Sequence, residues 1–92
     1  MAPGTHDLKV AEEVEQIQKD LVRLGAKNAE GKYVVKYGVL FDDEFGQQYY
    51  EALVGTLKAA KKQGIIDFKG QMLLKGAHDN VDIILLKDPV IE

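Results

Sequence analysis

The sequence predicts an α+β domain of the winged-helix-like type, in which helices pack on a small antiparallel sheet. Apolar residues recur at helical spacing in two stretches, near residues 8–24 and 44–63. Short segments rich in apolar and β-branched residues follow, at 32–37 and within 72–86. The chain has 92 residues, of which 46% are hydrophobic, so it suits one domain with a single core.

The first helix is predicted to begin at Leu8, after a disordered lead over residues 1–7. Thr5 or Asp7 would cap its start, and Gly25 stands where a left-handed terminator belongs. Its apolar stripe is Val10, Val14, Ile17, Leu21 and Leu24. The opposite face is charged and expected to be solvated: Glu12, Glu13, Glu15, Lys19, Asp20 and Arg23. A coiled coil is the alternative, but the short stripe favours packing within this domain.

Residues 25–31 have the composition of a loop, and 32–37 follow as a strand. The brief segment 38–41 fits a single helical turn and an apolar crossover equally well. The acidic residues 42–44 precede one long helix, whose first turn they would cap. Its apolar stripe is Tyr50, Leu53, Val54, Leu57 and Ala60. Gly64 ends this helix, and Ile65 is placed for a Schellman-type cap.

A second face of the long helix carries only small residues: Ala52, Gly55, Thr56 and Ala59. Glycine inside a helix costs about 1 kcal/mol relative to alanine, which suggests a packing reason. Two explanations of this small-residue face are open: tight contact with the first helix, and a flat surface that binds a partner. In either case Gly55→Leu is expected to be harmful.

The C-terminal part is predicted to be a hairpin of strands 72–74 and 81–86, joined by residues 75–80. Regular structure ends at Asp88, because proline follows it. The domain therefore spans 8–88, and residues 89–92 form a C-terminal tail.

Composition excludes several classes of protein. The chain has no cysteine, so disulfides and thiolate metal sites are absent and a cytosolic location is favoured. No apolar run approaches the ~20 residues that cross a bilayer, and residues 1–7 lack a signal segment. His6 and His78 lie far apart, and His78 is expected to be a solvated loop residue. The acids at 42–44 lack the spacing of a calcium loop. We expect no catalytic residue, metal or cofactor.

A basic cluster is the candidate binding site. Lys58, Lys61 and Lys62 lie in the last turns of the long helix, and Lys36 and Lys69 extend the cluster if the fold is right. Cations at a helix end also complement the helix dipole, so a solvated helix end is the simpler alternative. The functional interpretation is electrostatic contact with an acidic protein surface.

A winged-helix shape also raises nucleic-acid binding as the alternative function. The residues argue against it. Net charge is −3, acids open the long helix, and Arg23 is the single arginine of the chain. Arginine to guanine is the commonest specific base contact.

Four motifs resemble the Costars family: LGAKN at 24–28, VKYGVLFDD at 35–43, EALVGTLKAAKK at 51–62 and GAHDNVDIILL at 76–86. This family includes small stand-alone proteins linked to actin dynamics and cell motility. Its domain also forms the C-terminal actin-binding part of the striated-muscle activator of Rho signalling, with a winged-helix-like fold. The resemblance implies a cytoplasmic, cytoskeleton-associated, monomeric regulator that binds actin or an actin-associated protein. It supplies no list of binding residues.

Overall fold

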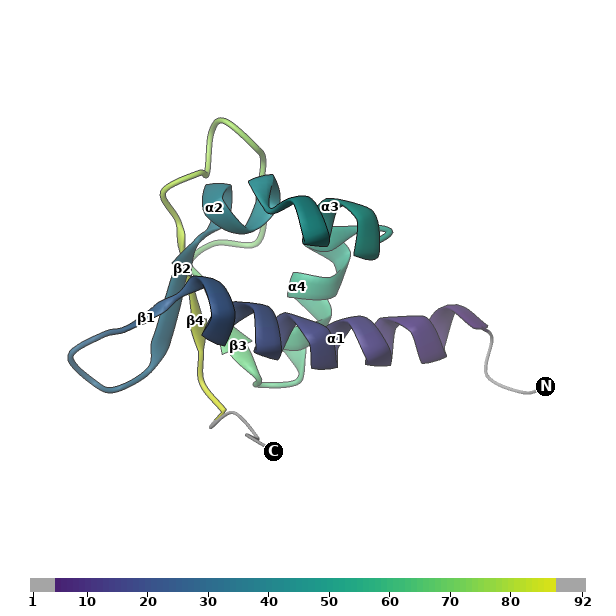
Figure 1. Ribbon diagram of the computed structural model, residues 1–92, viewed down its shortest axis with the longest axis horizontal. Coiled ribbons are helices and arrows are strands. Elements are labelled where there is room, and N and C mark those ends of the chain that lie inside the picture. The colour runs from purple at the N-terminus through teal and green to yellow at the C-terminus, as the bar shows by residue number, and fades with distance from the viewer. Residues whose placement is uncertain (1–4, 88–92) are drawn as a thin grey trace.

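The computed structural model describes residues 5–87 and contains helices and strands in mixed order (Figure 1). The helices are α1 (Thr5–Leu24), α2 (Tyr37–Asp42), α3 (Glu44–Tyr49) and α4 (Leu53–Lys62). The strands are β1 (Ala26–Lys27), β2 (Tyr33–Lys36), β3 (Ile66–Asp67) and β4 (Asp82–Leu85). Most of the predicted lead, residues 1–4, and the predicted tail lie outside the described residues.

The strands form one antiparallel sheet in the order β1-β2-β4-β3. In the centre, Val35 of β2 lies opposite Ile83 of β4, and Ile66 of β3 lies opposite Leu85. Helix α1 packs against this sheet and against α2 and α4. The predicted α+β class, with helices on a small antiparallel sheet, is confirmed, while the likeness to a winged helix stays a prediction.

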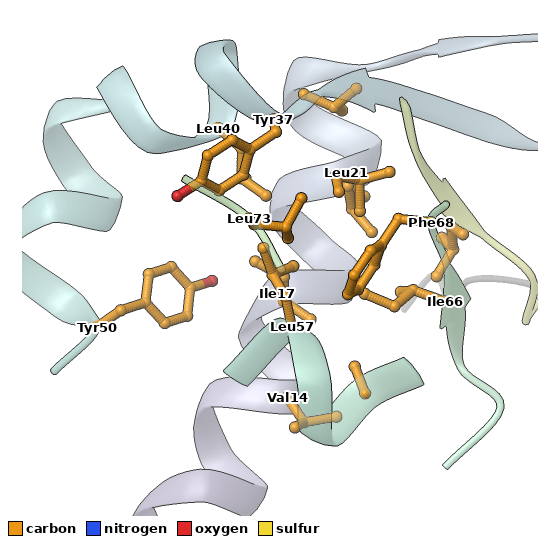
Figure 2. Packing of buried hydrophobic residues seen from close by; sticks show 14 residues of the cluster. Val14, Ile17, Leu21, Tyr37, Leu40, Tyr50, Leu57, Ile66, Phe68 and Leu73 are labelled. Atoms are coloured by element: carbon orange, nitrogen blue, oxygen red, sulfur yellow. The ribbon is translucent and has the colours of Figure 1, made fainter. Parts of the chain in front are cut away.

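The core lies between α1, α4 and the sheet (Figure 2). Val14, Ile17 and Leu21 of α1 are buried, as the apolar stripe predicted, and α1 packs within its own domain. The other buried apolar residues are Val35, Tyr37, Leu40, Tyr50, Leu57, Ala60, Ile66, Phe68, Leu73, Ile83 and Leu85. Apolar burial contributes roughly 25 cal/mol per Å², so this cluster is the main source of stability.

The end of α1 differs from the prediction at two points. Gly25 does not take a left-handed conformation; positive φ angles occur at four other glycines of residues 5–87. Glycine is required at position 25 because the backbone of other residues approaches it closely. A Cβ there would lie 2.5 Å from the Leu21 carbonyl oxygen and 2.8 Å from that of Val34. The expected loop at 25–31 also contains β1, which pairs with β2. At its other end α1 starts at Thr5, three residues before the predicted Leu8.

The predicted long helix is wrong: it is two helices, α3 and α4, separated by residues 50–52. Tyr50 and Ala52 both have extended backbone conformations, with ψ values of 130° and 91°. The break turns Tyr50 inward, where its side chain is buried and its hydroxyl bonds to Asp20. Tertiary contacts therefore override the helical pattern at residues 50–52.

Two local predictions around these helices are confirmed, and one open choice is decided. Segment 38–41 is helical, within α2, and is not a crossover. Asp43 caps α3, because its side chain accepts a hydrogen bond from the Gly46 N–H at 3.0 Å. Gly64, with φ +77°, ends α4 in a Schellman motif in which the Ile65 N–H bonds to the Ala60 carbonyl.

The predicted hairpin is wrong in one of its strands. β4 pairs with β3, a strand that the sequence interpretation missed, and residues 72–74 form no strand. Residues 68–81 connect β3 to β4, with Leu73 inserted into the core and its neighbours Met72 and Leu74 exposed. His78 is half-buried and structural, since its Nδ1 accepts a hydrogen bond from the Leu74 N–H at 2.9 Å.

The small-residue face of the long helix is divided by the fold. Thr56 is buried against α1, but Gly55 is exposed, and a Cβ there would meet only Ala52 at 3.6 Å. Tight contact with α1 therefore does not explain Gly55. A larger side chain at this position would not disturb the packing of α4 against α1.

Candidate protein-binding surface

The five predicted lysines occupy three different settings. Lys58, Lys61 and Lys62 lie on α4, Lys69 follows β3, and Lys36 ends β2. Two of the five are engaged within the chain, so the cluster is smaller than the sequence suggested.

Lys61 holds the backbone that follows β3. Its ammonium donates hydrogen bonds to the carbonyl oxygens of Phe68, at 2.5 Å, and Gly70, at 2.9 Å. It also lies 4.3 Å from the centre of the Phe68 ring, a cation–π contact. In the sequence, Lys69 lies between Phe68 and Gly70, whose carbonyl oxygens accept these hydrogen bonds. Lys61 thus ties the backbone on both sides of Lys69 to α4.

Lys36 is neutralised at another place in the fold. Its ammonium lies 2.7 Å from a carboxylate oxygen of Asp82, its cross-strand partner on β4, and donates a hydrogen bond to the Asn80 carbonyl. No contact within residues 5–87 brings Lys36 to the α4 lysines.

The remaining three lysines are exposed, and within residues 5–87 they form no ion pair or hydrogen bond. Lys58 and Lys62 lie one turn apart on the same face of α4. We call Lys58, Lys62 and Lys69 the α4 lysine surface. All three side chains are exposed, and Lys61 ties the segment that carries Lys69 to α4.

A buried polar cluster lies elsewhere, around Asp20, and corrects the expectation that Glu13 and Asp20 are solvated. Asp20 accepts hydrogen bonds from the Tyr50 hydroxyl at 2.5 Å, from Gln16 at 3.0 Å and from Arg23 at 3.2 Å. Glu13 accepts one from Thr56 Oγ1 at 2.7 Å. Burial, together with the bond to Asp20, raises the pKa of Tyr50.

This cluster suits stability rather than reactivity. Every buried side-chain N or O atom among residues 10–87 has a hydrogen-bond partner. Arg23 also bonds Asp43 through both guanidinium nitrogens, at 3.2 and 2.7 Å, and this holds the pKa of Asp43 below its ordinary value. The single arginine is therefore committed to two carboxylates, which gives the nucleic-acid alternative no support.

The described part of the chain contains neither a metal-binding cluster nor a membrane-spanning helix. Over residues 5–87, no group of three or more His, Cys, Asp or Glu side chains is arranged to hold a metal ion. No helix there has the length and apolar character needed to cross a membrane.

Exposed apolar side chains form the feature that sequence reasoning missed. The large ones are Val39, Phe45, Met72, Leu74 and Leu86. Phe45 stacks on Tyr49 and is covered by the Arg23 guanidinium. Met72 and Leu74 stood in the predicted strand, and the unbroken apolar run of residues 72–74 gave no signal of which side chains would be exposed.

Comparison with known proteins gives consistent matches over almost the whole chain. The sequence model of the Costars family matches residues 9–86. Protein costars of Dictyostelium discoideum is 59% identical over 81 residues, which cover 88% of this chain and 99% of that protein. The human Costars family protein ABRACL is 53% identical, covering 88% of this chain and 100% of its own length. The solution structure of the human HSPC280 protein is similar, with a TM-score of 0.79 and 54% identity, over 86% of this chain and 93% of that one.

Proposed function

This chain belongs to the Costars family, as its motifs predicted, and we propose that it regulates the actin cytoskeleton by binding a protein partner. The partner is actin itself or an actin-associated protein, and the chain acts in the cytoplasm as a monomer, by binding and not by catalysis. The link of small Costars proteins to actin dynamics and motility supports this proposal.

The α4 lysine surface carries the proposal. On a chain of net charge −3, three exposed lysines without internal partners form a local positive region. Actin presents acidic surface, so charge complementarity would steer the encounter and orient the complex more than it would raise affinity. Such contacts weaken as salt rises, because exposed charges are screened over about 8 Å at physiological ionic strength.

Co-sedimentation with filamentous actin at two salt concentrations tests this function. The test variant changes Lys58, Lys62 and Lys69 together to Glu. A matched variant changes three exposed lysines outside α4, Lys19, Lys27 and Lys87, to Glu. Both alter net charge equally. We expect the wild type and the matched variant to pellet with actin at low salt, and the test variant to remain in the supernatant.

A second measurement distinguishes whether the partner is actin itself or an actin-associated protein. Binding to purified actin identifies actin as the partner. Pelleting that appears only after actin-associated proteins are added identifies one of those instead. Equal pelleting by the test variant and the wild type would contradict the lysine surface, and no pelleting under either condition would contradict the actin role.

A further inference from the structure

A second surface of the molecule exposes apolar side chains from α2 and from the connection between β3 and β4. Val39 is 51% exposed, Met72 59% and Leu74 51%. We call these three residues the α2–loop patch. Large exposed apolar side chains on neighbouring segments are typical of binding surfaces, and Met is enriched in protein interfaces.

The two segments are held together by direct contacts. The Tyr37 N–H donates to the Val81 carbonyl at 2.8 Å, and the Gly38 N–H donates to the Asp79 carbonyl at 2.9 Å. A Cβ on Gly38 would lie 2.9 Å from the Cβ of Asp79, so α2 and the connection meet without a gap. In Figure 1 the green-to-yellow connection rises beside α2.

Leu73 fixes the direction of its neighbours. Figure 2 shows Leu73 among the core side chains near Tyr37 and Ile17. Met72 and Leu74 flank it and are exposed, so both project outward while Leu73 anchors the segment. The patch is therefore presented by a fixed backbone, which lowers the entropic cost of binding.

The segments that carry the patch are acidic. Asp42 ends α2, Asp43 lies between α2 and α3, and Glu44 begins α3, while these two helices contain no basic residue; Asp79 lies in the connection. Lys75 is the one lysine or arginine of residues 71–80; its ammonium lies 3.1 Å from Asp79 and 3.7 Å from Asp42. Arg23 neutralises Asp43 in the same way. Asp42 and Asp79 share Lys75 as their basic partner, and Glu44 adds a further carboxylate. The net charge of these segments is therefore negative.

We propose that the α2–loop patch binds an amphipathic helix of a partner protein, one whose apolar face is bordered by Lys or Arg. The apolar side chains of such a helix would cover Val39, Met72 and Leu74, and its basic residues would meet Asp42, Glu44 and Asp79. This goes beyond the proposed function, because an acidic partner of the α4 lysine surface would be repelled here. The two surfaces together make the chain a connector between an acidic and a basic protein.

The test is an NMR titration of the full-length ¹⁵N-labelled chain with two synthetic helical peptides. Both have about 18 residues, five turns of helix, with leucines on one face. One carries lysine on its flanks and the other glutamate. We expect the lysine peptide to shift the amide signals of residues 38–42 and 72–79, and the glutamate peptide to shift neither set.

Serine variants test the apolar contribution. Changing Val39, Met72 and Leu74 together to Ser is expected to weaken binding of the lysine peptide by about tenfold or more, since central apolar contacts dominate interface energetics. Leu86→Ser removes an exposed leucine outside the patch and is expected to leave the affinity unchanged. Thermal unfolding of each variant shows that it is folded.

Three results would overturn the proposal. One is equal binding of the glutamate peptide; another is a set of shifted signals centred on α1 or α4. The third is concentration-dependent broadening of residues 38–42 and 72–79 without peptide, which would make a second copy of the chain the occupant. Co-sedimentation of the serine variant with actin is measured in a separate experiment. A failure of the peptide-binding proposal therefore does not contradict the proposed actin role.

Discussion

The hydroxyl of Tyr50 donates a 2.5 Å hydrogen bond to the carboxylate of Asp20, thirty positions earlier in the chain. Asp20 is fully buried near the C-terminal end of α1, and Tyr50 stands at the break between α3 and α4. Gln16 and Arg23 donate to the other carboxylate oxygen. This contact ties α1 to the point where the second helical pattern is interrupted.

Tyr50→Phe is expected to lower the free energy of unfolding by about 1–3 kcal/mol, because it leaves a buried carboxylate oxygen without its donor. Tyr49→Phe is the matched control, since the Tyr49 ring is half-buried beside Tyr50 and no hydrogen bond of its hydroxyl occurs within residues 5–87. Urea denaturation measures both variants. Equal stability of the two would show that the Tyr50–Asp20 bond is not stabilising.

The Asp43–Arg23 pair is expected to make stability depend on pH on the acid side. The Asp43 carboxylate accepts hydrogen bonds from Arg23 and from the Gly46 N–H, and these bonds hold the pKa of Asp43 below its ordinary value of about 3.9. A depressed pKa stabilises the fold above the unfolded-state value, and that stabilisation is lost as pH falls through the folded-state value. Asp43→Asn is expected to cost about 0.5–1 kcal/mol at pH 7.

The difference between wild type and Asp43→Asn should shrink as pH falls below about 4, because the unfolded chain then takes up a proton at Asp43 that the folded chain takes up only at lower pH. Urea denaturation at pH 7, 5 and 3 measures it. Asn still caps a helix, so Asp43→Ala should cost about 1 kcal/mol more at every pH. A difference that does not change with pH would contradict the role of the Asp43 charge.

Alanine at two glycines is expected to have opposite effects. At Gly25 the new Cβ would clash with the backbone oxygens of Leu21 and Val34, so the β1–α1 junction must shift, at a cost of about 1–3 kcal/mol or more. At Gly55 there is room, and alanine in an exposed helix is expected to stabilise by about 0.5–1 kcal/mol. Thermal unfolding compares them. Destabilisation by Gly55→Ala would mean that this face of α4 is packed.

Lys61 and Lys58 are expected to differ although both lie on α4. Lys61→Ala removes the charged donor of the Phe68 and Gly70 carbonyls and should cost about 1–2 kcal/mol. Lys58→Ala should change stability by less than about 0.5 kcal/mol, as surface substitutions usually do. Hydrogen exchange should quicken for residues 67–70 in the Lys61 variant alone. Equal protection in the two variants would count against the positioning role of Lys61.

Local features of this chain follow from the sequence because they depend on neighbouring residues. The α1 stripe of Val14, Ile17 and Leu21 has the 3.6-residue period of a helix, and it is buried. Gly64 and Ile65 form the predicted Schellman cap, and Asp43 the predicted N-cap. The family is also evident from the motifs. Each of these features depends on residues close together in the chain.

Other features depend on contacts between distant residues, and only the tertiary structure decided them. The helical pattern across 44–63 is broken because Tyr50 gains a buried bond with Asp20. The strand-like segment 72–74 forms no strand because Ile66 pairs with Leu85 at the edge of β4. Lys36 and Lys61 leave the predicted binding cluster because Asp82 and the Phe68 and Gly70 carbonyls engage them. Sequence periodicity describes which face is apolar, whereas pairing between remote groups decides which polar side chains stay free to bind a partner.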